Sequence, residues 1–251
     1  MKKAVFFDWD GTLSADGLHV SPENRKAIRR LQEKGHLAFL CTGRAYSFIP
    51  EEALKFGFDG IVCGAGCHII VGDKTIFHVS IPEYILREVF LHFLKKAEGH
   101  CWLEGEDSMF LIGAEPPSDS PWPRLEKFED FDRFVTGHPI TKLTFGKTLE
   151  EDSKALLTQY FSLISQVGYH EAVLKGHNKA TGIEKVLNYF HLTQKDSVGV
   201  GDSRNDLDML RYTALSIVMG NAPEEVKKEA DRIAGSAGEN GVAQALEQWV
   251  L

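Results

Sequence analysis

Short apolar runs typical of buried strands alternate with helix signals along the first third of the chain. The strand-like runs are residues 3–7, 37–41 and 60–63. After the first run, Ser21 followed by Pro22 is a typical helix start, and Gly35 supplies a stop. A second helix is predicted over residues 46–56. Strand, helix, strand, helix, strand is the order of a right-handed parallel α/β unit, so the sequence predicts a Rossmann-like parallel-sheet core.

The same alternation returns in the last third of the chain, whereas the middle differs. The late helices are predicted at 182–190, 205–212, 223–230 and 242–250, and the late strands at 196–200 and 214–219. The middle segment is predicted to contain a helix after Pro82, strands near 101–104, 109–112, 143–145 and 169–174, a proline-rich loop at 115–123 and a helix at 155–164. We therefore expect an α/β core of residues 1–81 and 178–251, interrupted by an inserted α+β domain of residues 82–177.

Composition and charge argue against nucleic-acid and membrane partners. Hydrophobic residues are 43% and charged residues 25% of 251, an ordinary globular mixture. The formal net charge is −8 and no Lys or Arg run exceeds two residues, so a nucleic-acid partner is not expected. The longest apolar run, 37–41, is far too short to span a bilayer, so no membrane is expected either. Four cysteines without a CxxC pair favour reduced thiols in a cytoplasmic protein and leave disulfides open. We expect a monomer or weak homodimer.

Two carboxylates two residues apart follow the first predicted strand, in the sequence DWDGT at residues 8–12. Open α/β sheets bind ligands at the carboxyl ends of their strands. Asp8 and Asp10 could share one divalent cation there, and Gly11 lets the backbone turn sharply around it. An ionised Asp beside Mg²⁺ can also attack an electrophile. Taken alone, the motif leaves an ordinary strand-ending turn open.

A second acidic motif, GDSRND at residues 201–206, follows a late predicted strand. At the same sheet edge, Asp202 would add a ligand for the cation. Asn205 and Asp206 begin the next predicted helix, whose N–H groups attract anions. Standing alone, this motif is as typical of a helix cap as of a functional site.

Two further segments offer groups that bind phosphate. Thr42, Gly43 and Arg44 follow the strand at 37–41, where a hydroxyl, a glycine N–H and a helix N-terminus together form an anion nest. Lys179 precedes the helix predicted to start near Gly182 and would supply a point positive charge in an acidic chain. Singly, these are an ordinary turn and an ordinary surface lysine.

In order and spacing, the four segments resemble the phosphatase branch of the haloacid dehalogenase (HAD) superfamily. Residues 8–13 (DWDGTL), 42–43, Lys179 and 201–206 match its four motifs, and the insert resembles its C2-type cap. The sequences CTGR at 41–44, MGNAP at 219–223 and ENGV at 239–242 are similar to the Cof-type subfamily. In one departure, Ala65 begins the stretch where such proteins often carry Asn-Gly-Ala after the third strand.

The resemblance implies a HAD fold with an α+β C2-type cap and Mg²⁺-dependent hydrolysis of a small phosphomonoester, such as a sugar phosphate. It implies that Asp8 attacks phosphorus, forming an aspartyl phosphate. Asp10 would protonate the leaving oxygen and then deprotonate the water that clears the intermediate. The implied metal ligands are Asp8, the Asp10 carbonyl and Asp202.

The resemblance also assigns the remaining groups. The implied phosphate-binding residues are Thr42, Gly43, Lys179 and Asn205. Asp206 would orient the surroundings of the metal, and Arg44 would lie near the substrate or pair with a carboxylate. The small phosphorylated metabolite itself is not specified by the sequence, because selection in C2-capped proteins lies largely in the cap.

Two other functions stay open on the sequence. A phosphomutase or phosphotransferase would deliver the same phosphoryl group to a sugar hydroxyl. A non-catalytic metabolite-sensing protein would bind without turnover, and the intact set of Asp8, Asp10, Lys179 and Asp202 argues against it. A dinucleotide site at residues 64–66 is rejected, because the third glycine of that fingerprint is replaced by Ile69.

Overall fold

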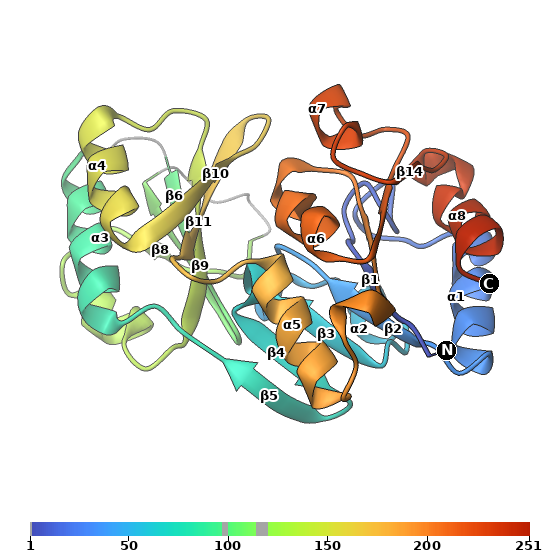
Figure 1. Ribbon diagram of the computed structural model, residues 1–251. Coiled ribbons are helices and arrows are strands. Elements are labelled where there is room, and N and C mark those ends of the chain that lie inside the picture. Colours follow the sequence, from blue (N-terminus) through green and yellow to red (C-terminus); the bar gives the residue numbers. More distant parts are fainter. Residues whose placement is uncertain (1, 97–99, 114–119) are drawn as a thin grey trace. The chain divides into compact units, whose positions relative to one another are not determined.

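The computed structural model describes residues 2–96, 100–113 and 120–251 and divides into two compact units (Figure 1). Unit 1 consists of Met1–Arg44, Ile49–His78 and His177–Leu251, and unit 2 of Ala45–Phe48 and Val79–Gly176. Each unit has its own sheet and its own hydrophobic core. Residues 45–48 belong to unit 2 although their sequence neighbours belong to unit 1, which no sequence pattern predicted.

Unit 1 is built on an eight-stranded sheet with the order β14-β13-β12-β1-β2-β3-β4-β5. The strands are β1 (Ala4–Phe7), β2 (Leu37–Cys41), β3 (Gly60–Cys63), β4 (His68–Val71), β5 (Lys74–His78), β12 (Ser197–Gly201), β13 (Leu215–Val218) and β14 (Arg232–Ile233). Strands β14 through β3 run parallel, which confirms the predicted core. The antiparallel β4–β5 hairpin extends this sheet and was not predicted.

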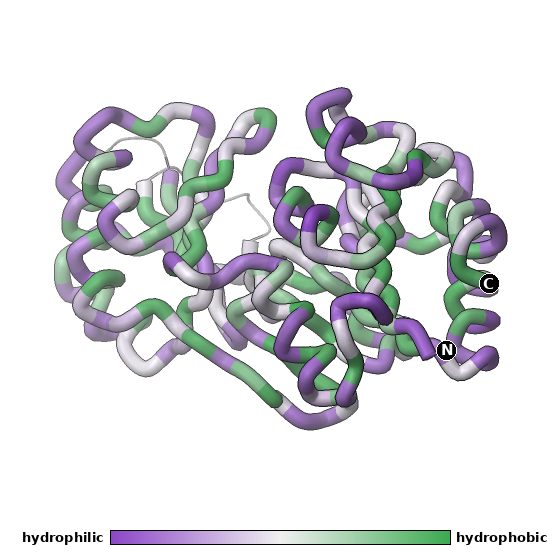
Figure 2. Tube along the Cα trace, in the orientation of Figure 1, coloured by the Kyte–Doolittle hydropathy of each residue, from purple (hydrophilic) through white to green (hydrophobic). Residues whose placement is uncertain are grey.

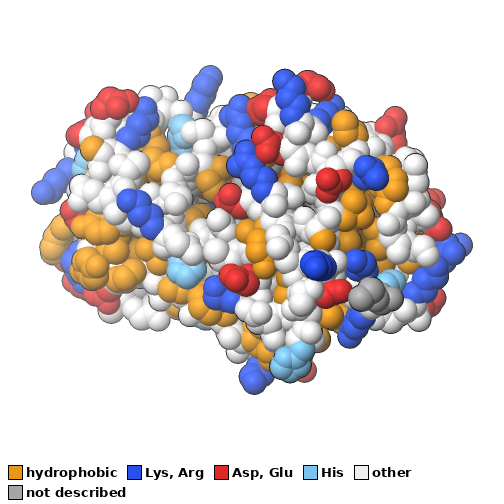
Figure 3. Space-filling model, in the orientation of Figure 1, with side chains coloured by type: hydrophobic (Ala, Val, Ile, Leu, Met, Phe, Trp, Pro, Cys, Tyr) orange, Lys and Arg blue, Asp and Glu red, His pale blue; other side chains and the backbone are white. Residues whose placement is uncertain are grey.

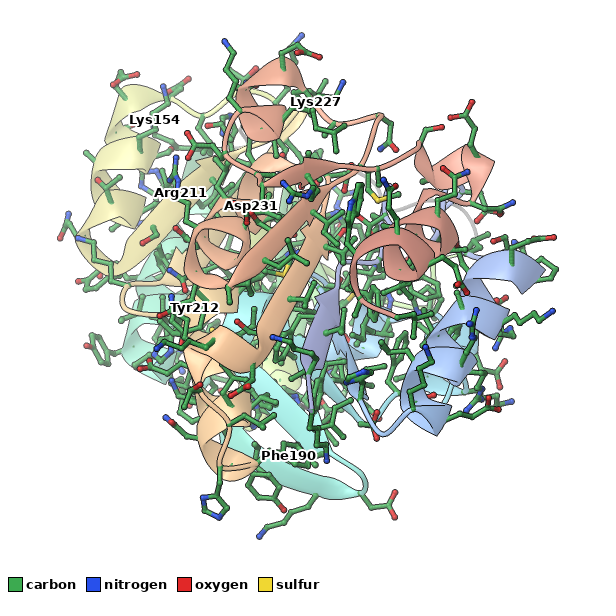
Figure 4. All side chains as sticks on the ribbon, turned by 45° about the vertical axis from the view of Figure 1, so that its right-hand side comes forward. Lys154, Phe190, Arg211, Tyr212, Lys227 and Asp231 are labelled. Carbon is green, nitrogen blue, oxygen red and sulfur yellow. The ribbon has the colours of Figure 1, made fainter. Side chains whose placement is uncertain are left out.

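Helices flank the unit 1 sheet. They are α1 (Pro22–Glu33), α2 (Glu51–Leu54), α5 (Lys179–Tyr189), α6 (Leu207–Tyr212), α7 (Glu224–Lys227) and α8 (Gly241–Trp249), with short 3-10 turns η2 (Gly64–Gly66), η4 (Gln194–Asp196), η5 (Arg204–Asp206) and η6 (Ala237–Glu239). Ile183 of α5 and Met209 of α6 pack with Phe39 of β2 in one core. Phe190 and Tyr212, labelled in Figure 4, are partly buried against it. Figure 2 shows the hydrophobic residues concentrated along the central strands of the sheet.

Helix α1 begins where its sequence signals predict, because the Ser21 hydroxyl accepts the N–H of Asn24 at 3.2 Å. The helix predicted over residues 46–56 is wrong in its middle. A 3-10 turn, η1 (Tyr46–Phe48), and helix α2 are separated by Pro50, whose ψ of 145° is extended. Proline has no N–H to continue a helix, so the helical stretch divides there.

Unit 2 is an α+β unit with the strand order β10-β11-β9-β6-β7-β8. Its elements are α3 (Glu83–Lys96), β6 (His100–Gly105), β7 (Met109–Gly113), β8 (Arg124–Leu125), a π-helical turn η3 (Phe131–Val135), β9 (Ile140–Gly146), α4 (Glu151–Tyr160), β10 (Phe161–Ser165) and β11 (Tyr169–Leu174). The core forms where Phe90 and Phe93 of α3 pack with strand residues such as Leu143. Apart from the parallel β7–β8 pair, the strands are antiparallel.

The predicted helix over 155–164 is wrong in its second half. Helix α4 ends at Tyr160, and Phe161 turns to extended backbone with φ −119° and ψ 152°. The following residues form β10, which pairs antiparallel with β11. Apolar residues at 161, 163 and 164 fit either period, so the pairing with β11 decides the outcome. Of the predicted proline-rich loop, residues 115–119 lie outside the described residues.

Exposed ion pairs between arginine and glutamate side chains lie on the surface of unit 1. Arg204 pairs with Glu225 and Arg211 with Glu229, at 2.8 and 2.9 Å. On the face seen in Figure 3, acidic and basic side chains are interspersed. Exposed pairs of this kind contribute little to stability. Among the described residues, no helix has the length and apolar character needed to cross a membrane.

Candidate active site

Asp8 stands directly after β1, at the carboxyl end of the parallel sheet. Its N–H donates to the carbonyl of Val200 at 2.9 Å, which continues the pairing with β12, and the residue is only 4% exposed. The chain then turns at Gly11, where φ is +75°. A Cβ on Gly11 would lie 2.4 Å from Oδ2 of Asp202. Glycine is therefore required here both by the turn and by the approach of motif four.

Lys179 is a buried cation held between two carboxylates. Its Nζ donates to Oδ1 of Asp8 at 2.6 Å and to Oδ1 of Asp206 at 2.6 Å, and its side chain is fully buried. Helix α5 begins at Lys179 itself, three residues before the predicted start, because Asn178 caps it. The ordinary surface lysine that the isolated residue suggested is therefore excluded.

Two glycines let the backbone of η2 approach the start of α5. A Cβ on Gly66 would lie 2.1 Å from the Asn178 carbonyl oxygen, and one on Gly182 would lie 3.0 Å from Cα of Gly66. The backbone of η2 thus packs directly on the first turn of α5, which carries Lys179. Ala65, between the glycines of η2, has φ 51° and ψ 42°, in the left-handed region where Asn is better tolerated than Ala.

Motif four is held together by the Asp206 side chain. Oδ2 of Asp206 accepts the N–H of Asp202 at 3.0 Å and the N–H of Ser203 at 2.9 Å, while Oδ1 accepts from Lys179. The side-chain oxygen of Asn205 accepts from the Ser203 hydroxyl at 2.9 Å. The fully buried Asp206 therefore ties the motif-four loop to the buried lysine.

Electrostatics in this cluster favour a cation. Burial, reinforced by the Asp206 carboxylate, raises the pKa of Asp8 well above its ordinary value, although Lys179 opposes the shift. The same two causes raise the pKa of Asp202 to about 7. For Lys179, burial lowers the pKa, but Asp206 and Asp8 outweigh it and hold the pKa well above the ordinary value. Crowded, desolvated carboxylates are stabilised by a further positive charge.

The donor set fits a hard divalent cation. One carboxylate oxygen from each of Asp8, Asp202 and Asp206 lies within 4.8 Å of the others. Carboxylate oxygens are the ligands Mg²⁺ prefers, and it is commonly held by one or two of them together with phosphate oxygens. Of the three, Asp206 already accepts from Lys179 and two backbone N–H groups, and Asp8 and Asp202 are the two carboxylates that the family resemblance implies as metal ligands.

Asp10 and Arg44 form a separate pair beside this cluster. Arg44 donates from Nε to Oδ2 of Asp10 at 2.8 Å and from Nη2 to Oδ1 at 2.7 Å. The Asp10 side chain is half exposed, at 50%, and Arg44 is 18% exposed. The Thr42 hydroxyl accepts the N–H of Arg44 at 3.1 Å, and Gly43 between them is buried. Of the two positions expected for Arg44, the structure shows the pairing with a carboxylate.

Two polar contacts to Asp202 come from residues to which the sequence analysis gave no role. The Thr12 hydroxyl donates to Oδ1 of Asp202 at 3.1 Å, and the Asn221 amide donates to Oδ2 at 3.3 Å. Both residues belong to sequences that carry the family resemblance, DWDGTL and MGNAP. Their place in these sequences could have pointed to the site, but the contacts with Asp202 depend on packing that the sequence does not show.

Comparison with known proteins decides the family. The family model of haloacid dehalogenase-like hydrolases matches residues 5–246. The chain belongs to this family. A 5-amino-6-(5-phospho-D-ribitylamino)uracil phosphatase of Bacillus subtilis is 28% identical over 99% of the chain and 96% of its own length. An HMP-PP phosphatase of Yersinia enterocolitica is 26% identical over 100% of the chain and 96% of its own length.

Solved HAD structures share the fold. A HAD subclass IIB sugar phosphatase superposes with a TM-score of 0.84 at 24% identity, covering 99% of both chains. A phosphatase of the superfamily from Bacteroides thetaiotaomicron gives a TM-score of 0.83 at 24% identity, covering 98% of this chain and 94% of that one. The HAD membership and the α/β fold predicted from sequence are thus confirmed. The roles of individual site residues stay predictions.

Proposed function

We propose that this HAD hydrolase is a Mg²⁺-dependent phosphatase that cleaves a small phosphomonoester through an aspartyl phosphate on Asp8. The observation that carries the proposal is the buried cluster at the sheet edge. There Asp8 contacts Lys179 at 2.6 Å, and Asp202 and Asp206 lie within 4.8 Å. A carboxylate held beside a cation and a metal site is equipped to attack phosphorus rather than merely to bind phosphate.

In the first half-reaction, a carboxylate oxygen of Asp8 attacks phosphorus, and the bond from phosphorus to the leaving oxygen breaks. Asp10 gives its proton to that oxygen, so the product leaves as an alcohol. In the second half-reaction, Asp10 takes a proton from water as the water oxygen attacks phosphorus. The bond to Asp8 then breaks, and inorganic phosphate and the free carboxylate are restored.

The remaining residues hold the reacting groups. As the Asp8 oxygen attacks phosphorus, Lys179 gives up its hydrogen bond to Asp8. Its ammonium then donates to a phosphoryl oxygen instead. Thr42, Gly43 and Asn205 donate to the other phosphoryl oxygens. Arg44 donates to both oxygens of Asp10, so this pair has to open, and Asp10 has to take up a proton, before Asp10 acts as the acid.

The metal would be held by Asp8, Asp202 and the carbonyl of Asp10. When bound, Mg²⁺ offsets the repulsion between the carboxylate and the phosphate and stabilises charge on the phosphoryl oxygens. Asp206 acts indirectly, because it fixes both Lys179 and the backbone that carries Asp202.

The relatives support only a broad substrate class, small phosphorylated metabolites, because their names specify different members of it. Within this proposal, residues 82–177 form the C2-type cap that supplies specificity. The protein acts in the cytoplasm as a monomer or weak homodimer, without nucleic-acid or membrane partners.

The test is phosphate release from a panel of phosphomonoesters that includes sugar phosphates and p-nitrophenyl phosphate. We expect turnover of at least one ester with Mg²⁺, loss of turnover with EDTA and recovery when Mg²⁺ is restored. Turnover unaffected by EDTA would contradict the metal requirement. Transfer of phosphate between sugar hydroxyls in place of release would identify a phosphotransferase, and tight binding without turnover would identify a sensor.

A further inference from the structure

Each oxygen of the Asp202 carboxylate accepts a hydrogen bond, and the two donors come from different segments of unit 1. Thr12 donates to Oδ1 at 3.1 Å and Asn221 to Oδ2 at 3.3 Å. We propose that Thr12 and Asn221 are positioning residues that fix the plane of the Asp202 carboxylate for metal binding. The inference rests on the proposed function, because it takes Asp202 as a ligand of the metal.

Thr12 is suited to this role by its burial and its place in the chain. It follows the tight turn at Gly11 and is completely buried. A hydroxyl has one hydrogen to donate, and Thr12 donates it to Oδ1 of Asp202. The link therefore joins the turn after the proposed nucleophile to the proposed metal ligand from motif four.

Asn221 has its amide orientation fixed by partners on both sides. Its Oδ1 accepts the N–H of Ala237 at 2.9 Å, so the NH₂ group must face the other way. There Nδ2 donates to the carbonyl of Gly11 at 2.9 Å and to Oδ2 of Asp202. One side chain thus connects the motif-one turn, motif four and the η6 turn.

The Gly11 backbone completes the fixation. A Cβ at Gly11 would lie 2.4 Å from Oδ2 of Asp202, so the carboxylate lies close against this backbone. A ligand already held in one rotamer loses less conformational entropy when a metal binds. Removal of such an outer partner typically lowers metal affinity by about 10- to 100-fold.

The experiment measures the Mg²⁺ dissociation constant of the full chain by calorimetry, without substrate, so that catalysis does not enter the readout. The variants are Thr12→Val, which removes the hydroxyl at nearly constant shape, Thr12→Ser, which restores it, and Asn221→Ala. Asn188→Ala is the matched control, because Asn188 is an exposed asparagine of α5. Asp202→Asn tests the metal ligand itself.

We expect Thr12→Val and Asn221→Ala each to raise the dissociation constant by about 10-fold or more. Thr12→Ser should recover most of the affinity lost in Thr12→Val, and Asn188→Ala should match the wild type. If Asn221→Ala does not fold, the comparison of Thr12→Val with Thr12→Ser tests the proposal on its own.

The contradicting outcomes separate the two proposals. If Asp202→Asn loses Mg²⁺ while the folded Thr12→Val and Asn221→Ala variants bind as tightly as the wild type, the positioning inference is wrong and the metal site stands. If Thr12→Ser binds as weakly as Thr12→Val, the hydroxyl is not the cause and the inference is also wrong. If Asp202→Asn binds Mg²⁺ as the wild type does, the metal ligand of the proposed function is wrong.

Discussion

Replacing Lys179 by Met should destabilise unit 1 far more than an ordinary lysine substitution does. Met keeps a long apolar chain but removes the ammonium that lies 2.6 Å from both Asp8 and Asp206. Both carboxylates are buried and would lose their cation. Removing one partner of a buried ion pair costs about 3–5 kcal/mol, a large part of the 5–15 kcal/mol that stabilises a typical domain.

The assay is urea unfolding in EDTA, so that no divalent cation replaces the lysine. Lys26→Met is the matched control, since Lys26 is exposed on α1 and its loss should change stability by no more than about 0.5 kcal/mol.

Without the ammonium, the pKa of Asp8 rises further above its unfolded value. The folded state then binds more protons than the unfolded state, so stability falls as pH rises. The deficit of Lys179→Met should therefore be smaller near pH 5 than near pH 8. A loss below about 1 kcal/mol, or a deficit that grows as pH falls, would show that the Lys179 ammonium does not stabilise the buried carboxylates.

Three further outcomes are expected. Asp10→Asn should lower kcat by about 10²-fold or more for an alkyl phosphate and by less for p-nitrophenyl phosphate, and equal losses would speak against a general acid. Gly182→Ala should lower the free energy of unfolding by about 1–3 kcal/mol, because its Cβ would lie 2.6 Å from a valine methyl. Gly238→Ala, with open space around it, is the control, and a similar loss in both would show that packing is not the cause. Lys142→Met should destabilise unit 2 by about 3–5 kcal/mol, since this buried ammonium lies 2.6 Å from Glu171. Hydrogen exchange confined to unit 2 measures it, and unchanged protection would contradict the prediction.

The sheet edge of the site was predictable because it follows from topology. Asp8 and Asp202 each come directly after an apolar run, and parallel strands bring their carboxyl ends to one edge. β1 and β12 are neighbours, so the two carboxylates meet across one strand pair. The start of α5 at Lys179 was missed although its capping residue, Asn178, is a local signal in the sequence. The burial of the Lys179 ammonium between Asp8 and Asp206 was not predictable, because it requires three segments far apart in sequence to pack together.

Other features were predicted wrongly, incompletely or not at all, because contacts between different segments of the chain decide them. The apolar residues of 161–164 satisfy a helix period and a strand period equally, and the pairing of β10 with β11 decides between them. The family resemblance implied two positions for Arg44, and the one it takes, paired with Asp10, depends on how two loops pack together. The contacts of Thr12 and Asn221 with Asp202 likewise arise only when three loops pack together.

If Asp8 receives the phosphoryl group, Asp8→Asn removes the attacking oxygen and turnover must be lost. Phosphate release with Mg²⁺ is compared among the wild type, Asp8→Asn and Asp73→Asn, the last being the same change at an exposed aspartate in the β4–β5 turn. We expect folded Asp8→Asn to lose kcat by at least about 10³-fold, while Asp73→Asn matches the wild type. Folded Asp8→Asn that retains more than a trace of wild-type kcat would contradict it.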